Sequence, residues 1–242
     1  MMSSSKKIII IGASSGIGKA LAIQYARRGH LVAITGRRIE LLEEIKTSFP
    51  SNIIVKSLDV TANENIQHIE SLVQELGGLD LLIYNAGFGE PSATLEKSID
   101  ERTIKTNVVG FAEIVRYGFE YFAKQGYGQI AGTSSIASVR GNSLAPAYSA
   151  SKAFMSVYLE GLYIRSKKMK LNIAITDIQP GFVRTKMARG NKQFWVVSLE
   201  KATRQIFEAI EAKRFRVYIS KRWRLIAILM KIVPLFIYRR IA

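Results

Sequence analysis

The chain contains no cysteine among its 242 residues. This absence excludes a disulfide framework, a thiol nucleophile and a thiolate metal site. Histidine, aspartate and glutamate form no cluster with the spacing of metal ligands, so we expect no metal centre. The segment before Lys7 is short and polar, which argues against a signal peptide. We therefore expect a reducing, cytoplasmic setting.

The chain also lacks an apolar run long enough to cross a bilayer, which requires roughly 20 residues. The apolar stretch near the C-terminus covers 13 residues, 225–237, and is interrupted by Lys231 and Pro234. With 242 residues, of which 48% are hydrophobic, the chain fits one domain that buries a substantial core.

Acidic residues are scarce in the C-terminal quarter. The formal net charge is +16, but residues 182–242 hold 15 of the 35 basic residues and only three of the 19 acidic ones. After Ala212 the chain has nine basic residues and no acidic one. This asymmetry indicates a tail with an anionic partner rather than a generally basic fold.

Residues 7–20, KIIIIGASSGIGKA, join a buried strand to a helix through a glycine-rich turn. The four consecutive isoleucines favour a strand covered on both faces, and a helical pattern follows over residues 19–28. Glycines let a ligand approach the backbone, and free N–H groups at a helix start favour phosphate. A nucleotide is the expected ligand, although a strand-to-helix turn without a ligand is the alternative. The expected contacts are Gly12, Ser14, Ser15, Gly16, Ile17 and Gly18.

Strand and helix patterns alternate along the rest of the chain. Further strands are predicted at residues 31–35, 52–58, 79–84, 127–133, 171–178 and 215–219. Helices are predicted between them at residues 39–49, 63–76, 95–124, 147–168 and 200–213. This order predicts one α/β domain over residues 1–220, doubly wound in three layers around a seven-stranded parallel sheet. A basic, apolar extension over residues 221–242 follows it.

No acidic residue follows the second predicted strand, where Arg37 and Arg38 stand after Gly36. In a dinucleotide fold an acid at this place holds the ribose hydroxyls, whereas a basic residue accepts a 2′-phosphate. We therefore expect NADP(H) to be preferred over NAD(H), with Arg37 as the leading phosphate contact and Arg38 near the adenine. Two solvated arginines at a helix start are the alternative.

Three polar residues stand at suggestive intervals in the second half of the chain. Tyr148 and Lys152 are four residues apart on a predicted helix and so share one face, and Ser135 precedes Tyr148 by 13 residues. Asn107 lies inside a predicted helix, where asparagine is unfavourable unless it has a specific role. Hydrogen bonding between helices is the alternative role for Asn107.

The G-x-x-x-G-x-G turn together with Ser135 and Tyr-x-x-x-Lys resembles the classical short-chain dehydrogenase/reductase family over residues 7–185. Ile11 replaces the family's usual threonine, and Tyr84 replaces the first asparagine of its Asn-Asn-Ala-Gly motif. The resemblance implies a Rossmann fold and reversible hydride transfer between NADP(H) and a carbonyl or secondary alcohol. The catalytic residues that it implies are Asn107, Ser135, Tyr148 and Lys152.

The resemblance also implies a role for each catalytic residue. Tyr148 exchanges the proton, and Lys152 lowers the pKa of Tyr148 and holds the ribose. Ser135 holds the substrate oxygen, and Asn107 connects Lys152 to solvent through water. The further cofactor contacts that it implies are Asp59, Val60, Asn85, Ala86, Gly87, Pro180, Gly181, Val183 and Thr185, besides Tyr148 and Lys152.

Some of these residues have other expected roles. Asp59 also fits a turn or cap, Thr61 is the expected N-cap of the next helix, and Asn85 is expected mainly to fix neighbouring strands. The helix over residues 147–168 is expected to build a homodimer or homotetramer, because it carries apolar side chains suited to a second subunit.

An apolar lid over residues 186–199 and the tail suggest a hydrophobic or lipid-like substrate. Arginines, tryptophan and tyrosine flank the apolar run of residues 221–242, which favours attachment to an anionic membrane surface, at its inner face. Packing of the tail on its own domain or a partner subunit is the alternative, and nucleic acid suits its aliphatic residues poorly. A catalytically silent cofactor sensor or scaffold protein at a membrane is the second function considered.

Overall fold

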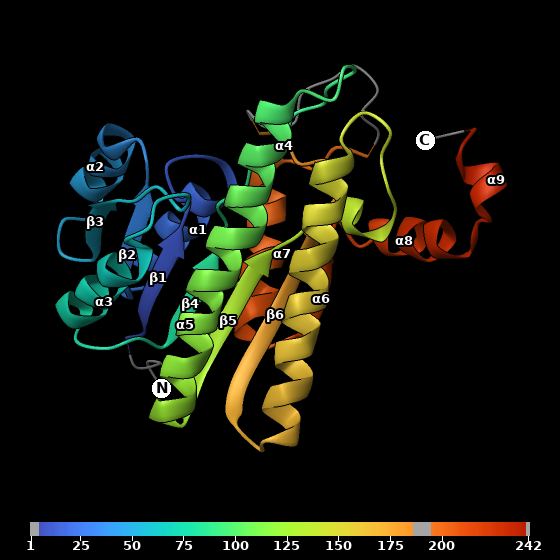
Figure 1. The fold of residues 1–242 in the computed structure, drawn as a ribbon. Helices are drawn as coiled ribbons and strands as arrows, with labels where there is room; N and C mark the ends of the chain where they lie inside the picture. Colours follow the sequence, from blue (N-terminus) through green and yellow to red (C-terminus); the bar gives the residue numbers. More distant parts are fainter. Residues whose placement is uncertain (1–4, 186–194, 241–242) are drawn as a thin grey trace.

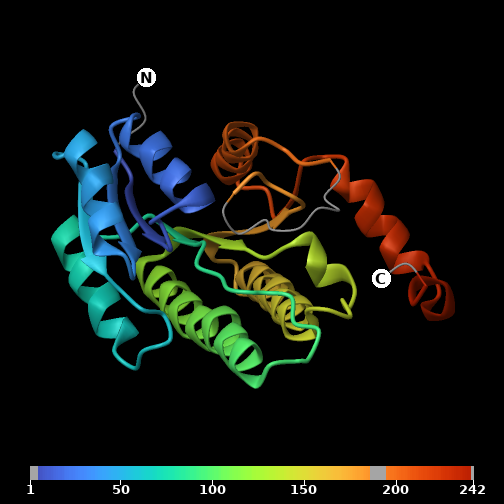
Figure 2. The same cartoon turned by 90° about the horizontal axis from the view of Figure 1, so that it is seen from above.

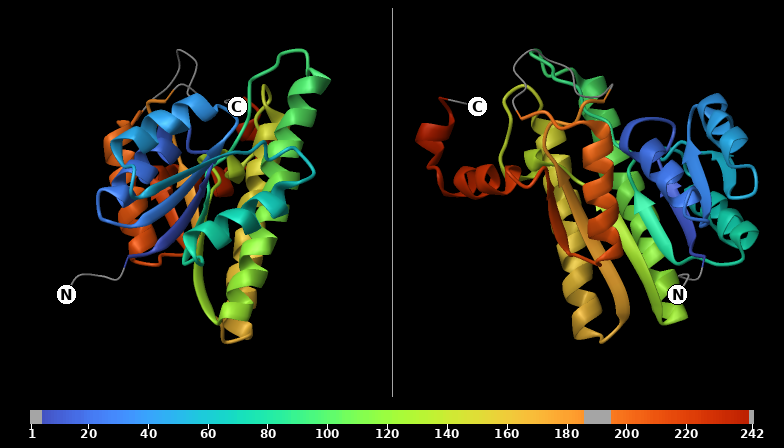
Figure 3. Two further views of the ribbon diagram at one scale, coloured as in Figure 1. Left: turned by 90° about the vertical axis from the view of Figure 1, so that its left-hand side faces the viewer. Right: turned by 180° about the vertical axis from the view of Figure 1, so that it is seen from behind.

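The computed structural model describes residues 5–185 and 195–240 (Figure 1). Of the lid expected over residues 186–199, residues 186–194 lie outside this description. The described chain forms three layers, with helices on both faces of a central sheet, as Figure 3 shows from the side and from behind.

The sheet has seven strands in the order β3-β2-β1-β4-β5-β6-β7, and every neighbouring pair is parallel. The strands are β1 Lys7–Ile11, β2 Leu31–Gly36, β3 Ile53–Ser57, β4 Leu81–Tyr84, β5 Tyr127–Thr133, β6 Asn172–Pro180 and β7 Arg216–Ile219. This confirms the predicted α/β fold with a doubly wound sheet. The strand order reverses between β1 and β4, and in such sheets ligands bind at the carboxyl ends of the strands beside this reversal.

Helices cover the sheet in two layers. The helices are α1 Gly16–Ala26, α2 Ile39–Ser48, α3 Asn65–Leu76, α4 Lys97–Ile104, α5 Gly110–Gln125, α6 Pro146–Lys168 and α7 Leu199–Glu211. Successive residues of β1 point to opposite faces, so Ile8 and Ile10 pack in the core with α1, α2 and α7. Ile9 and Ile11 pack in the core with α3, α5 and α6.

One helical run covers residues 97–125, which confirms the helix predicted over residues 95–124. A π-helical turn, η1 Lys105–Val109, separates α4 from α5. The fully buried Tyr84 donates a hydrogen bond of 2.7 Å from its hydroxyl to the carbonyl oxygen of Thr106 in this turn. A side chain at Gly110 would collide with the carbonyl oxygen of Val60, so the turn also lies close to the end of β3. Such turns are frequent at functional sites.

After β7 the chain continues into α8 Trp223–Ile232 and α9 Leu235–Tyr238. Figure 2 shows both helices at one side of the molecule, with α9 farthest from the sheet. Trp223 and Ala227 are buried, and α8 contacts a short 3₁₀ turn, η2 Ile136–Val139. Within the described ranges, no helix is both long and apolar enough to span a membrane.

Candidate active site

The glycine-rich turn after β1 packs directly on the end of β4. Gly12 has a φ of +84°, and a Cβ there would lie 2.6 Å from the backbone nitrogen of Ala86. A Cβ on Gly18 would lie 2.2 Å from the carbonyl oxygen of Gly12. Both glycines are therefore required by close backbone packing, which holds the turn in one shape.

Arg38 reaches from the end of β2 to the same turn. Its Nη2 donates hydrogen bonds of 2.8 Å to Ser14 Oγ and 3.1 Å to Ser15 Oγ. Ser15 makes no side-chain cap at the start of α1, so its hydroxyl faces Arg38 instead. Arg37 is exposed to solvent at the end of β2. The guanidinium beside the turn is therefore that of Arg38, where the sequence pointed first to Arg37.

Asn85 joins three strands behind the turn. Its Nδ2 donates a 3.0 Å hydrogen bond to the carbonyl oxygen of Gly12, and its Oδ1 accepts a 3.2 Å hydrogen bond from Thr133 Oγ1. Its backbone N–H donates to the carbonyl oxygen of Ile11. Asn85 thus fixes the carboxyl ends of β1, β4 and β5 relative to one another.

The side chain of Asn107 ties the loop after β4 to α6. Its Nδ2 donates hydrogen bonds of 2.7 Å to the carbonyl oxygen of Phe88 and 2.9 Å to Ser151 Oγ. Its Oδ1 accepts a 2.9 Å hydrogen bond from the backbone N–H of Phe88. A Cβ on Gly87 would lie 3.2 Å from Lys152 Nζ and 3.6 Å from Asn107 Oδ1. The side chains of Asn107 and Lys152 therefore both lie close to Gly87.

Ser135 and Tyr148 face each other at the carboxyl end of β5. A hydrogen bond from Ser135 lowers the pKa of the Tyr148 phenol, but burial raises that pKa more strongly. The pKa of Tyr148 is therefore raised overall, and the phenol is protonated at neutral pH. Ser135 Oγ also accepts a 3.1 Å hydrogen bond from the backbone N–H of Ala137, which fixes its place at the start of η2.

Lys152 is almost fully buried one helical turn after Tyr148. Its Nζ donates a 2.9 Å hydrogen bond to the carbonyl oxygen of Thr133 and lies 3.4 Å from Met155 Sδ. Burial lowers the pKa of Lys152 to about 7, although the negative charge of Asp177 raises it. Lys152 Nζ lies 5.8 Å from the centre of the Tyr148 ring. In this geometry the lowering influence on the Tyr148 pKa comes from Ser135 rather than from Lys152.

Asp177 is a buried charge at the back of the site that the sequence did not single out. It stands on β6, is 0% exposed, and accepts a hydrogen bond of 3.0 Å from Arg216 Nε. Further donors to its carboxylate are Ser134 Oγ, Ser156 Oγ and Gln179 Nε2. The available signal was that Asp177 is the only charged residue of a predominantly buried strand. Ser134 precedes Ser135, so this carboxylate supports the chain segment that carries the serine.

The Asp59 carboxylate forms a local turn. Its Oδ1 accepts hydrogen bonds of 3.0 Å from the backbone N–H of Thr61 and 2.9 Å from its hydroxyl. Helix α3 begins at Asn65 with Glu64 before it, so the expected N-cap at Thr61 is wrong. Val60 is buried, and its carbonyl oxygen accepts a 3.1 Å hydrogen bond from Asn65 Nδ2.

The segment after β6 runs back towards the glycine-rich turn. A Cβ on Gly16 would lie 3.6 Å from Thr185 Cγ2, so Thr185 stands beside that turn. Val183 is buried and pairs with Val197 in an isolated bridge. Gly181 donates a hydrogen bond of 2.6 Å to the carbonyl oxygen of Ile219, immediately after Pro180 at the end of β6.

The predicted cofactor and catalytic residues thus lie around the carboxyl edge of the sheet from β3 to β6, with Asn107 in η1 and with Tyr148 and Lys152 in α6. Ile17 packs on the hydrophobic core from the first turn of α1. Within the described part of the chain, no group of three or more histidine, aspartate or glutamate residues could hold a metal ion.

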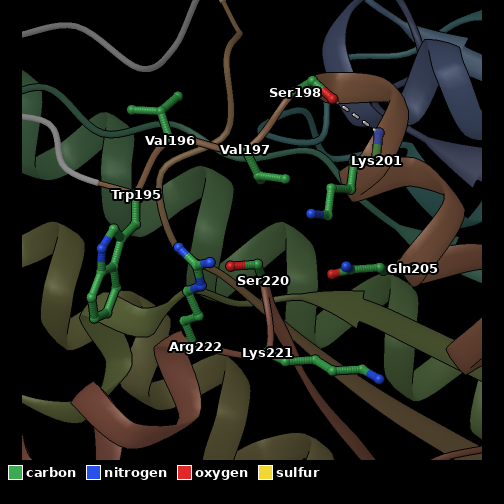
Figure 4. A pocket seen from close by; sticks show the side chains of 9 residues that line it. All are labelled: Trp195, Val196, Val197, Ser198, Lys201, Gln205, Ser220, Lys221 and Arg222. Carbon is green, nitrogen blue, oxygen red and sulfur yellow. Dashed lines mark hydrogen bonds between the residues drawn. The ribbon is translucent and has the colours of Figure 1, made fainter.

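A separate pocket of about 340 Å³ lies between the start of α7 and the end of β7 (Figure 4). In the figure the side chains of Lys201, Gln205 and Arg222 extend towards a common space beside Ser220. The remaining lining residues are Trp195, Val196, Val197, Ser198 and Lys221. The lining contains three basic residues and no acidic one, which suits an anionic ligand.

Comparisons with known proteins identify the family. The model of the family described as short chain dehydrogenase matches residues 6–194. An uncharacterized oxidoreductase of Myxococcus xanthus is 36% identical over 196 residues, which cover 78% of this chain and 76% of that protein. An uncharacterized oxidoreductase of Mycobacterium tuberculosis is 29% identical over 248 aligned positions, covering 98% of this chain and 97% of that protein.

Two solved structures share the fold at low sequence identity. A short-chain dehydrogenase from Sphingobium yanoikuyae in complex with NADPH has a TM-score of 0.80 at 20% identity, over 95% of this chain and 97% of that one. A short-chain dehydrogenase/reductase from Burkholderia phymatum in complex with NAD has a TM-score of 0.84 at 20% identity, over 94% of this chain and 93% of that one.

Proposed function

The chain belongs to the short-chain dehydrogenase family and is an oxidoreductase of it, and on this premise we propose that it transfers a hydride between NADP(H) and a carbonyl or secondary alcohol. The observation that carries the proposal is the meeting of Ser135, Tyr148, Lys152 and Asn107 beside the glycine-rich turn. A catalytically silent sensor would not require these four side chains together.

The residues around the turn fit a dinucleotide. Gly12 and Gly18 leave no side chain between the turn and the end of β4, and the first N–H groups of α1 are available to a phosphate. The two similar solved structures hold NADPH and NAD, which supports a nicotinamide cofactor here. When bound, this cofactor would supply or accept the hydride.

We propose that NADP(H) is preferred over NAD(H). No acid follows β2 to hold the ribose hydroxyls, and the Arg38 guanidinium lies within hydrogen-bond distance of Ser14 and Ser15. A 2′-phosphate beside these serines would receive charge-assisted hydrogen bonds from Arg38, with Arg37 as a second cation at the same strand end.

The protonated Tyr148 is the proton donor in carbonyl reduction. Its raised pKa keeps the proton on the phenol until negative charge develops on the substrate oxygen. Ser135 hydrogen-bonds the same phenol, so the two hydroxyls can converge on that oxygen and stabilise it. For alcohol oxidation, lowering a tyrosine pKa from 10 to 7 would require about 4 kcal/mol of added stabilisation of the phenolate.

Lys152 provides positive charge within the site whenever it is protonated. Asp177 favours that charged form, and the backbone carbonyl of Thr133 fixes the ammonium in place. Asn107 is a positioning residue for the loop after β4 and for α6, because its amide hydrogen-bonds Phe88 and Ser151. The carbonyl oxygen of its amide has a second lone pair, which remains available for the expected water link to Lys152.

The substrate is proposed to be hydrophobic or lipid-like. Trp195 and Val196 belong to the described part of the segment expected to form the lid, and both are exposed, which supports this class. Assembly into a homodimer or homotetramer is proposed through α6, because Phe154 and Val157 are exposed on that helix. No contact with nucleic acid is proposed.

The central test is NADPH consumption by the purified protein with a panel of hydrophobic ketones and aldehydes. Tyr148→Phe is expected to lower kcat by about 10²- to 10⁴-fold, the usual contribution of general acid catalysis. NADPH binding, followed by fluorescence, and the circular dichroism spectrum should be unchanged in this variant. Binding of NADPH by the wild type without turnover of any member of the panel would favour the silent sensor instead.

The cofactor preference has its own test. Arg38→Asp is expected to lower the ratio of kcat/KM for NADPH over NADH by at least about tenfold, the value of one charge-assisted hydrogen bond. Arg37→Asp serves as the comparison and should have the smaller effect, because its side chain does not contact the turn serines. An unchanged ratio in both variants would refute the proposed preference.

A further inference from the structure

The two C-terminal helices carry an apolar surface that their own domain leaves uncovered. Leu225, Ile228, Leu229 and Ile232 recur at the i, i+3, i+4 and i+7 spacing of one helix face and are between 47% and 72% exposed. Leu235, Phe236 and Ile237 in α9 are also exposed. We call these seven residues the outer apolar face.

This concentration is unlike the rest of the described surface. Eighteen large hydrophobic residues are exposed there, and seven of them fall within residues 225–237. Isolated exposed hydrophobic residues are common, but a contiguous apolar surface marks a site of interaction. The outer apolar face is therefore a candidate interaction surface.

The outer apolar face has a fixed orientation, because the opposite side of α8 is packed on the domain. Trp223 and Ala227 are buried there, and Trp223 lies so close to Gly181 that any side chain at Gly181 would collide with it. Helix α8 is therefore apolar both on the side that packs on the domain and on the side exposed to solvent.

A second anchor lies beyond α8. Arg140 Nη2 donates a 2.6 Å hydrogen bond to the carbonyl oxygen of Val233, and its guanidinium lies 4.8 Å from the centre of the Tyr238 ring. The Tyr238 hydroxyl donates a 2.9 Å hydrogen bond to the carbonyl oxygen of Gly141. The tail is thereby held against the segment between η2 and α6, which lies between Ser135 and Tyr148 in the sequence.

Basic side chains border the outer apolar face. An α-helix turns by about 100° per residue, so Arg224 and Lys231 point in nearly the same direction on α8. Both lie along one edge of the outer apolar face. Arg239 and Arg240 follow α9, and no acidic residue occurs in the sequence after Glu211. This combination of apolar and basic side chains matches the acyl boundary and the headgroups of an anionic membrane.

A second copy of the chain is a poorer match for the same surface. A two-fold contact brings the same surface of both subunits together. The basic residues of both tails would then share one interface, without an acidic residue in either tail to pair with them. A lipid surface provides the negative charge that this face lacks.

We propose that α8 and α9 dock the protein on an anionic lipid bilayer through the outer apolar face. The helices lie in the headgroup region and do not cross the membrane. Because Arg140 and Gly141 hold the tail against the loop between Ser135 and Tyr148, docking places this side of the active site close to the membrane. The inference goes beyond the proposed reaction and does not depend on turnover.

The test is co-sedimentation of the full-length protein with vesicles. The wild type is expected to bind vesicles of phosphatidylcholine mixed with phosphatidylglycerol, and to bind less as salt is added. Leu229→Asp should reduce the partition coefficient by at least about tenfold, because a buried leucine contributes roughly 1.5–3 kcal/mol. Met169→Asp is the matched control, because Met169 has a similar exposure just after the end of α6, away from the tail, and this variant should bind normally.

A second pair of variants tests the charges. Arg224→Gln/Lys231→Gln should weaken binding to anionic vesicles by on the order of fivefold for each basic residue removed. Lys167→Gln/Lys168→Gln is the control, because it removes two exposed lysines from α6. Normal vesicle binding by Leu229→Asp would overturn the proposal. So would loss of an oligomer by this variant in lipid-free solution, measured by light scattering, because the face would then belong to a second copy.

Discussion

Replacing Lys152 with methionine is expected to stabilise the folded protein while abolishing turnover. Lys152 is 4% exposed, and burial lowers its pKa to about 7 from the ordinary value of 10.5. At pH 7 the Lys152 side chain is therefore deprotonated in about half of the folded molecules, whereas it is protonated in nearly all unfolded molecules. One pKa unit corresponds to about 1.4 kcal/mol, so the buried lysine costs about 4 kcal/mol at pH 7.

The pH dependence follows from the direction of this shift. Between about pH 7 and pH 10.5 the unfolded state binds more protons at Lys152 than the folded state does. The free energy of unfolding therefore rises with pH across this window. Below about pH 7 the destabilisation caused by burying Lys152 is fully present. Methionine removes the charge with similar volume but loses the hydrogen bond to Thr133, worth about 1 kcal/mol. Lys152→Met should therefore raise the free energy of unfolding by about 3 kcal/mol at pH 7, and this gain should disappear near pH 10.

The assay is urea unfolding of the cofactor-free wild type and Lys152→Met at several pH values from neutral to alkaline. The difference in unfolding free energy should shrink by about 1.4 kcal/mol for each pH unit. Lys168→Met is the control, because Lys168 is exposed on the same helix and should show no such trend. A difference that stays constant with pH, or a methionine variant that is less stable at pH 7, would refute the reasoning.

Two further substitutions test how the site is positioned. Tyr84→Phe should cost about 1–2 kcal/mol in urea unfolding and also lower kcat, because the carbonyl oxygen of Thr106 in the turn that carries Asn107 loses its donor. An unchanged kcat would mean that the turn keeps its shape without this bond. Gly89→Ala should reduce kcat by about 10²-fold with little change in NADPH affinity, because its Cβ would lie 2.1 Å from Tyr148 Cδ2 and displace the ring. Equal activity of this variant and the wild type would contradict that displacement.

The sheet was predictable because its signal is local. Strands buried on both faces require continuous apolar runs, and residues 8–11 satisfy this requirement with four isoleucines that are all fully buried. The spacing of Tyr148 and Lys152 likewise placed them one turn apart on α6, whatever surrounds them. Such features depend on neighbours in the sequence and survive without knowledge of the tertiary structure.

The π-helical turn was not predictable because its causes lie far away in the sequence. Residues 95–124 have a continuous helical pattern, and no residue within them predicts a local change from α-helical to π-helical hydrogen bonding. The turn is supported by the Tyr84 hydroxyl and by the close approach of Gly110 to Val60. The sequence therefore identified Asn107 as unusual but could not give the reason for its orientation.

The protonation of Lys152 shows the same limit at the level of chemistry. A Tyr-x-x-x-Lys spacing implies an ammonium near a phenol, but burial and a carboxylate on another strand decide whether that ammonium exists. Asp177 favours the charged form of Lys152 and also binds the serine that precedes Ser135. One buried carboxylate on β6 thus supports both the charge and the hydroxyl that face Tyr148. Since Arg216 on β7 holds this carboxylate, the last strand contributes to a site that lies two strands away.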